Sequence, residues 1–146
     1  EYLNDSVVRD DNYVYVNGAM RYDIDASSFT HLGGSYFKDN DDVYYDGVVM
    51  SANTTTFKYI SFDFARDRYY VYYGGDIIDG ADPATIEVLN KAYSRDVFGA
   101  FYENKKIQGV NTSTFEIIND EYARDRNYVY HLGEVLPGAN PITFVL

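Results

Sequence analysis

The side chains best able to do chemistry here are clustered acidic residues, two histidines and an unusual number of tyrosines. The densest acidic group is Asp39-Asn40-Asp41-Asp42, whose oxygen atoms are the ligands that Ca²⁺ prefers. The group lacks the alternating acidic residues, the glycine and the distal glutamate of an EF-hand loop. We therefore interpret it as a solvated turn whose Asp side chains accept backbone hydrogen bonds, with calcium binding as the alternative.

No residue pattern in the chain indicates catalysis. His31 and His131 occupy unrelated positions, and neither belongs to a metal or nucleophile spacing such as His-Glu-x-x-His. The carboxylates recur along the chain, whereas a glycosidase needs two unique ones at a single site. The absence of cysteine removes thiolate metal sites and cysteine nucleophiles. We expect a protein that is not an enzyme and that uses no cofactor or metal.

Tyrosine is the most abundant source of candidate binding side chains, with 17 Tyr and no Trp. Because successive strand residues point to opposite faces, the tyrosines separate into two sets. One set is Tyr13, Tyr15, Tyr70, Tyr72, Tyr128 and Tyr130, and the other is Tyr45, Tyr73 and Tyr102. We expect most tyrosines to pack structurally, because stacked repeats need contacts between units. The alternative is that one set lies in the core and the other forms an exposed stripe suited to protein contacts or sugar stacking. The candidate binding residues are therefore Asp39, Asp41, Asp42, Tyr45, Tyr73 and Tyr102.

The charge of the chain restricts its partners. A net charge of −11 argues against nucleic acid and fits either a basic protein partner or solubility alone. No apolar run approaches the roughly 18 residues of a membrane span. The chain opens on Glu1 and not on Met, which is expected if a targeting segment was removed. A periplasmic or cell-envelope location is consistent with that, but the oligomeric state has no signal in the sequence.

The same residue types recur at a fixed period, which indicates a repeat protein. An aspartate leads each repeat at intervals of 28 or 29 residues, and an aromatic residue follows five positions later. The leading aspartates are Asp10, Asp39, Asp67, Asp96 and Asp125. The aromatic residues are Tyr15, Tyr44, Tyr72, Phe101 and Tyr130. Repeat cores are expected near 8–32, 36–60, 65–89, 94–118 and 123–146, within a single repeat domain of residues 1–146.

Each block of the repeat favours a particular local structure. The Val-Tyr-Tyr segments are β-branched and aromatic, so we expect strands there. The dipeptides that follow, such as Asn17-Gly18 and Asp46-Gly47, suit the positive φ angles of a type I′ turn. In the second block, Asp82 is expected to cap one short helical turn that begins at Pro83. A repeat therefore contains about three short strands, with Tyr93-Ser94-Arg95 as a connection.

No repeat of this size can bury both of its faces alone, so neighbours must stack. We expect an all-β tandem array of about five 29-residue β-hairpin repeats, arranged as a solenoid or superhelical stack. A small five-bladed propeller-like ring is the alternative, although the repeat is short for a four-stranded blade. Glu1-Tyr2-Leu3-Asn4 matches Glu87-Val88-Leu89-Asn90 in phase. That match is expected if the array continued upstream, if its first repeat was cut, or if strand exchange closed a ring.

The recurring motifs resemble those of the DKNYY repeat family of bacterial proteins. The resemblance is carried by Asp125-Arg126-Asn127-Tyr128-Val129-Tyr130 and by Gly80-Ala81-Asp82-Pro83-Ala84-Thr85. The repeat led by Asp96 departs most, with Gly99-Ala100-Phe101 in the strand and Glu103-Asn104-Lys105 in the turn. The resemblance implies a bacterial repeat protein and brings no activity and no catalytic residues.

The leading functional hypothesis is a non-enzymatic protein-binding module. One concrete form is an immunity or inhibitor protein that captures a basic partner such as a toxin, because repeat arrays present extended surfaces and this one is acidic. The alternatives are a cell-envelope carbohydrate-binding repeat that uses exposed Tyr and a purely structural spacer. We expect specific function where the repeats disagree, at Asp39–Asp42, Gly99–Lys106 and His131.

Overall fold

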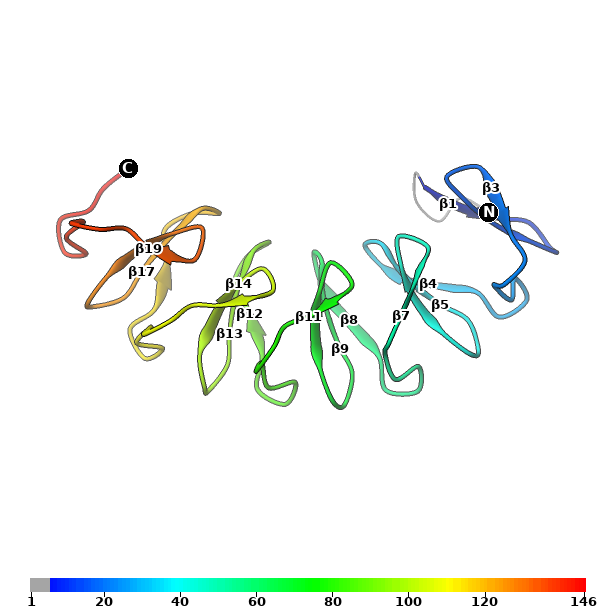
Figure 1. Cartoon of the computed structure of the whole chain (residues 1–146), viewed down its shortest axis with the longest axis horizontal. Coiled ribbons are helices and arrows are strands. Elements are labelled where there is room, and N and C mark those ends of the chain that lie inside the picture. Colours follow the sequence, from blue (N-terminus) through cyan, green and yellow to red (C-terminus); the bar gives the residue numbers. More distant parts are fainter. Residues whose placement is uncertain (1–5) are drawn as a thin grey trace. The chain divides into compact units, whose positions relative to one another are not determined.

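The computed structural model describes residues 6–146, which form strands, turns and loops without a helix (Figure 1). The strands build five small antiparallel sheets, one of three strands and four of four. None of the described residues belongs to a helix that could cross a membrane. The expected all-β class and the tandem hairpin architecture are therefore confirmed.

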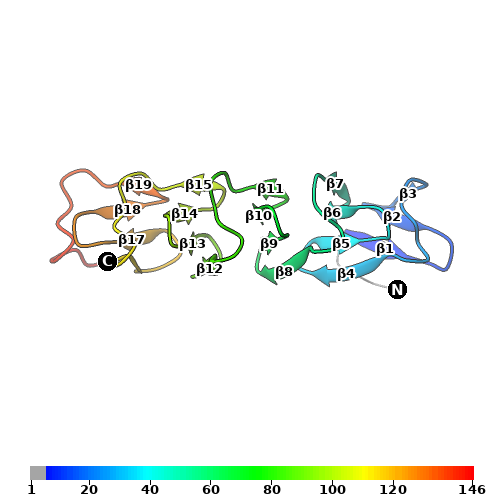
Figure 2. The same ribbon diagram turned by 90° about the horizontal axis from the view of Figure 1, so that it is seen from below.

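The strands of each sheet follow one another in chain order (Figure 2). The first sheet contains β1 (Val7–Arg9), β2 (Val14–Val16) and β3 (Ala19–Arg21). The second contains β4 (Thr30–Gly33), β5 (Tyr36–Lys38), β6 (Val43–Tyr45) and β7 (Val48–Met50). The third contains β8 (Lys58–Ser61), β9 (Phe64–Arg66), β10 (Val71–Tyr73) and β11 (Asp76–Ile77). The fourth contains β12 (Glu87–Val88), β13 (Tyr93–Arg95), β14 (Ala100–Tyr102) and β15 (Lys105–Lys106). The fifth contains β16 (Glu116–Ile117), β17 (Tyr122–Arg124), β18 (Val129–His131) and β19 (Glu134–Val135).

The chain divides into two compact units, of which the first ends at Asp76 and the second begins at Ile77. The first, second and third sheets belong to the first unit, apart from the last residue of β11. The fourth and fifth sheets belong to the second unit.

Each complete sheet has four strands, so the expectation of about three strands per repeat is wrong. The segment Tyr93–Arg95, expected as a connection, is strand β13 and pairs with β14, with Tyr93 opposite Tyr102. Strand β12 follows the turn of the preceding repeat and pairs with β13, so the four-stranded sheets join parts of two sequence repeats. Alternation of buried and exposed residues is too weak in three residues to show a strand by itself. Glu1-Tyr2-Leu3-Asn4, which matches β12 in phase, lies outside the described residues.

Two kinds of turn shape every repeat as expected. In the hairpins, φ is 52° at Asn17 and 77° at Gly18, and 48° at Asp46 and 77° at Gly47, as a type I′ turn requires. In the second block, Asp82 Oδ1 accepts a hydrogen bond from Ala84 N at 2.9 Å. The backbone carbonyl of Asp82 accepts one from Ile86 N at 3.0 Å, which closes a single turn. The cap is therefore where the sequence predicts it.

The core lies between successive sheets of each compact unit. The valines and the alanine of the central strands are fully buried, and so are the aromatic residues that follow them, except the half-buried Tyr15 of the first sheet. The small core residues are Val14, Val43, Val71, Ala100 and Val129, and the aromatic ones are Tyr44, Tyr72, Phe101 and Tyr130. Adjacent residues point to opposite faces of a strand, so both faces of these sheets are covered. Stacking of consecutive repeats is thus confirmed within each unit.

Aromatic rings make the contacts from sheet to sheet. Phe57, from the turn before the third sheet, packs against Tyr36 of the second sheet and Tyr72 of the third, with ring centroids 5.5 and 5.7 Å apart. Phe115 lies in the same way between Tyr93 and Tyr130, at 6.1 and 6.0 Å. The phenylalanine that follows the capped turn therefore joins two neighbouring sheets.

A matched pair of glycine substitutions tests this stacking. Gly18 and Gly47 occupy the same turn position with the same φ of 77°, but a Cβ on Gly47 would lie 2.5 Å from a Val16 methyl group, whereas one on Gly18 would have open space. Gly18→Ala should destabilise the fold by about 1–2 kcal/mol through backbone strain alone. Gly47→Ala should add a further ~1–3 kcal/mol from overpacking. Urea denaturation measures both, and equal losses would contradict close packing of the first two sheets.

Candidate functional site

The acidic loop that the sequence offers for ligand binding is organised by a buried carboxylate. Asp39 is 5% exposed, and its Oδ1 accepts hydrogen bonds from Asp41 N at 3.0 Å and Asp42 N at 2.8 Å. Its Oδ2 accepts one from the Tyr44 hydroxyl at 2.8 Å and one from Asp25 N at 3.1 Å. Asp39 therefore links its own loop, the next strand and the turn of the preceding repeat, and it serves the fold.

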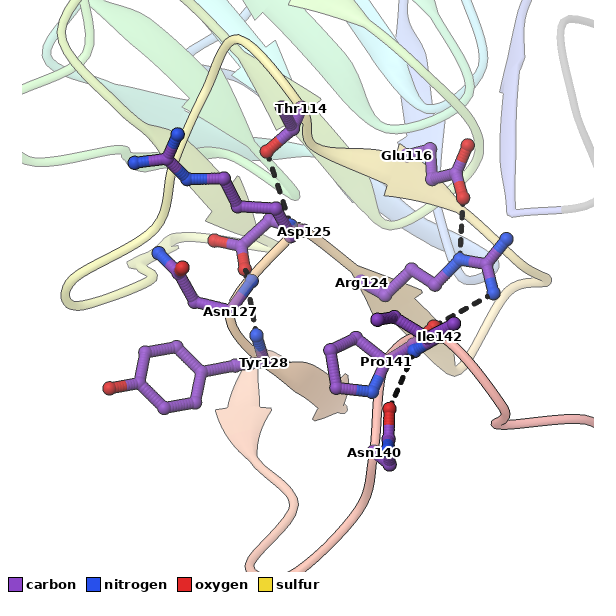
Figure 3. A network of polar contacts seen from close by, with 10 residues as sticks. Thr114, Glu116, Arg124, Asp125, Asn127, Tyr128, Asn140, Pro141 and Ile142 are labelled. Atoms are coloured by element: carbon purple, nitrogen blue, oxygen red, sulfur yellow. Dashed lines mark hydrogen bonds and ion pairs between the residues drawn. The ribbon is translucent and has the colours of Figure 1, made fainter.

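The same arrangement, in which one aspartate links its loop, a strand tyrosine and the turn of the preceding repeat, recurs along the chain, and we call it the carboxylate junction. Asp67 accepts hydrogen bonds from the Tyr72 hydroxyl at 2.9 Å and from Asn53 N at 2.7 Å, besides two loop N–H groups. Asp125 makes the equivalent set, and Figure 3 shows its loop contacts with Asn127 and Tyr128. Sequence reasoning assigned the loop contacts correctly but missed the hydroxyl and the preceding turn. The constant five-residue spacing from Asp to Tyr was the available signal.

Burial and hydrogen bonding shift the pKa values of both the aspartate and the tyrosine in this junction. Burial opposes ionisation of Asp39, Asp67 and Asp125, but the hydrogen bonds from N–H and O–H groups outweigh it, so each carboxyl pKa is lowered. Burial and the adjacent carboxylate raise the pKa of the partner hydroxyls Tyr44, Tyr72 and Tyr130. The pair is therefore a carboxylate and a neutral phenol at neutral pH.

These shifts predict a loss of stability at both extremes of pH. A lowered Asp pKa contributes stability that is present above about pH 4 and is lost as pH falls through the folded-state value. A raised Tyr pKa contributes stability that is present below about pH 10 and is lost as pH rises further. Tyr72→Phe should weaken the fold by ~1.5 kcal/mol at pH 7 and make the alkaline loss shallower. Urea midpoints from pH 3 to 11 measure this.

The exposed Tyr69 provides the control for that measurement. Tyr69→Phe removes a hydroxyl from a side chain that is 53% exposed, so stability should change by less than ~0.5 kcal/mol at any pH. An alkaline loss that is equally steep in Tyr72→Phe and in the unaltered chain would rule out the assigned junction.

Asp41 and Asp42 lie at the tip of the acidic loop, and only their backbone N–H groups contact Asp39. Within residues 6–146, no three His, Cys, Asp or Glu side chains are grouped so that they could hold a metal ion. His31 Nε2 lies 2.9 Å from Gly34 O, and its ring stacks on Phe37. His131 stacks on Tyr122 with ring centroids 4.6 Å apart. Both imidazoles therefore take part in packing of their own sheets.

The expectation that tyrosines of the same strand parity share the same burial is wrong for one set. Tyr70 and Tyr72 share a parity, yet Tyr70 is 47% exposed and Tyr72 is 1% exposed. Strand β10 begins at Val71, so Tyr70 belongs to the loop and alternation does not extend to it. Tyr45, Tyr73 and Tyr102 are half-buried and pack edge to face on neighbouring aromatic rings of their own sheets. They do not form a freely exposed stripe.

One of the predicted tyrosines, Tyr45, lines a surface groove between the second and third sheets. The groove has a volume of about 350 Å³, and it is lined by Tyr45, Asp46, Val48, Val49, Met50, Gly74, Gly75 and Asp76. Val48 and Val49 are 69% and 51% exposed, so the groove has an open apolar wall. The predicted residues Asp39, Asp41 and Asp42 lie at the opposite end of strand β6, and Tyr73 and Tyr102 do not line the groove.

A hydrogen bond to Asp63 and a ring contact with Tyr36 fix the position of the Tyr45 side chain. The Tyr45 hydroxyl donates to Asp63 Oδ1 at 3.0 Å, and its ring packs on Tyr36 with centroids 4.9 Å apart. Burial, together with the Asp63 carboxylate, raises the pKa of Tyr45 to about 12. Tyr45 therefore stays neutral, and with the exposed Asp46 and Asp76 the groove combines an apolar wall with an acidic rim.

The geometry defines the chain as a tandem β-hairpin repeat protein with a small surface groove. The profile of the DKNYY family matches residues 1–105 and, in an overlapping second segment, residues 49–146. The chain therefore belongs to the DKNYY family. No curated protein and no solved structure matches the chain.

Proposed function

We propose that the chain is a non-enzymatic protein-binding repeat module whose Tyr45 groove takes a basic segment of the partner. The observation that carries the proposal is the combination of apolar wall and acidic rim in this one groove. Tyr45, Val48 and Val49 supply the wall, and Asp46 and Asp76 supply the rim.

A lysine or arginine side chain of a partner matches both parts of the groove. Its aliphatic stem packs on apolar surface while its charged head stays near carboxylates and water. The half-buried Tyr45 is an aromatic anchor of the kind enriched at binding hot spots. The net charge of −11 supports fast encounter with a basic protein, since complementary potentials raise association rates. An immunity or inhibitor protein that captures a basic toxin is the concrete form of this function.

The double substitution Asp46→Lys with Asp76→Lys tests the groove. A synthetic peptide of alternating lysine and leucine should bind the unaltered chain and should bind this variant at least about tenfold more weakly, because like charges now face each other. A glutamate–leucine peptide should show the reverse preference. Isothermal titration calorimetry at low salt measures both peptides.

The matched control is Asp41→Lys with Asp42→Lys, which changes the net charge equally at the other end of β6. This control should alter peptide affinity only slightly, as expected for screened charge at a distance. An equal loss in both double variants would show that net charge alone attracts the peptide and would overturn the groove as the site.

Carbohydrate binding is the second candidate, and one observation favours it. Tyr13, Tyr70 and Tyr128 occupy the same loop position in three repeats and are 39%, 47% and 46% exposed. Exposed aromatic faces at repeat intervals suit stacking on the apolar faces of sugar rings. Binding on a glycan array that Tyr70→Ala and Tyr128→Ala both reduce, with Tyr45→Ala unchanged, would support this function. An array without signal would remove it.

A further inference from the structure

A second groove, in the third sheet, has the opposite charge to the rest of the chain. It has a volume of about 310 Å³ and is lined by Thr55, Thr56, Lys58, Arg66, Asp67 and Arg68. All of these residues belong to the first compact unit. Three cationic side chains therefore meet in a protein whose net charge is −11.

The register of the sheet sets two of these cations against each other. Lys58 of β8 lies directly opposite Arg66 of β9. Directly opposite residues project to the same face, and like charges in that position are destabilising. The corresponding pairs of the fourth and fifth sheets are Glu87 with Arg95 and Glu116 with Arg124. Those pairs form ion pairs at 2.8 and 2.5 Å. The third sheet thus has Lys58 at the position where the fourth and fifth sheets have a glutamate that pairs with the opposite arginine.

The third cation is held at the same groove by the loop. The Arg68 backbone N–H donates to Thr56 Oγ1 at 3.2 Å, and the Arg68 guanidinium lies 4.4 Å from the centre of the Tyr69 ring. Within residues 6–146 the Lys58 ammonium has no hydrogen-bond or ion-pair partner. The Asp67 carboxylate is 3% exposed and accepts four hydrogen bonds, so it is already satisfied by the fold.

We propose that Lys58, Arg66 and Arg68 form a binding site for a tetrahedral oxyanion, either phosphate or sulfate. Arginine guanidinium groups recognise such anions through paired N–H donors, and a lysine adds a point charge. This site goes beyond the protein-binding function, since it lies in a separate groove and takes a ligand of opposite charge.

The fifth sheet supplies an internal comparison. Its equivalent groove is lined by Thr114, Glu116, Arg124, Asp125, Arg126, Pro141 and Ile142, and Figure 3 shows Glu116 bonded to Arg124. That groove has two cations and two carboxylates, whereas the third-sheet groove has three cations and one carboxylate. The two sites share their backbone pattern, including the hydrogen bond from Arg126 N to Thr114 Oγ1 at 3.2 Å. The difference between Lys58 and Glu116 therefore decides which groove attracts an anion.

Reciprocal substitutions test the site with inorganic phosphate and inorganic sulfate as probes. Lys58→Glu should bind at least about tenfold more weakly, because it recreates the ion pair of the fifth sheet. Glu116→Lys should gain a second site and raise the stoichiometry from one to two. Lys105→Glu, in the exposed β15, changes net charge as Lys58→Glu does and should leave affinity nearly unchanged. Two-dimensional NMR titration measures affinity and locates the shifted residues.

Circular dichroism and thermal melts keep the outcome interpretable. Lys58→Glu should fold and melt no lower than the unaltered chain, because a glutamate opposite an arginine is the pair that the fourth and fifth sheets contain at this position. Phosphoserine serves as a further probe: tighter binding than inorganic phosphate identifies the ester group of a larger ligand, and equal binding identifies the free anion. The proposal is overturned if the unaltered chain binds none of these probes, or if Lys58→Glu and Lys105→Glu lose affinity equally.

Discussion

The buried carboxylate that heads four of the five repeats, at Asp39, Asp67, Asp96 and Asp125, is the constraint on which the structure depends. A strand of three residues offers few ladder hydrogen bonds, so a sheet made of such strands needs other links. In the second, third and fifth sheets, one aspartate accepts hydrogen bonds from its loop, from a strand tyrosine and from the turn of the preceding repeat. A buried charge is tolerated only when such bonds replace water. In the repeat led by Asp96 the residue five positions later is Phe101, which has no hydroxyl to donate, as fits the most divergent repeat.

The second constraint is that no sheet can be stable alone. Two- to four-residue strands bury enough apolar area only when both faces are covered. In the four-stranded sheets, a valine or alanine and the next aromatic residue are therefore buried together. Glycines at the hairpin turns let the neighbouring sheet approach, as where a Cβ on Gly75 would lie 2.9 Å from Tyr45 Cβ. The motif shared by the repeats is therefore a scaffold, and it is poorly suited to carry a specific activity.

The two proposed binding sites lie where the repeats differ in sequence. Val48 and Val49 of β7 leave an apolar wall beside Tyr45, which supports the proposed capture of basic segments. Lys58 replaces the glutamate of the later sheets and gathers positive charge in another groove. The third-sheet groove shares with the fifth-sheet groove the hydrogen bond from an arginine N–H to a threonine hydroxyl. A repeat array can thus change its ligands through single positions without altering the interactions that hold it together.

Periodicity in the sequence determined the class of structure and much of its detail. The spacing of Asp, Val, aromatic residue and Gly predicted the capped loops, the central strands and the type I′ turns, because these depend on neighbouring residues alone. The strand at Tyr93–Arg95 was missed, since three residues show no clear alternation. Only the tertiary structure decided that Tyr72 is buried while Tyr70 is exposed, that Asp39 is satisfied internally, and that Lys58 faces Arg66. Those outcomes depend on cross-strand register and on the adjacent sheet, and neither is visible within one repeat of the sequence.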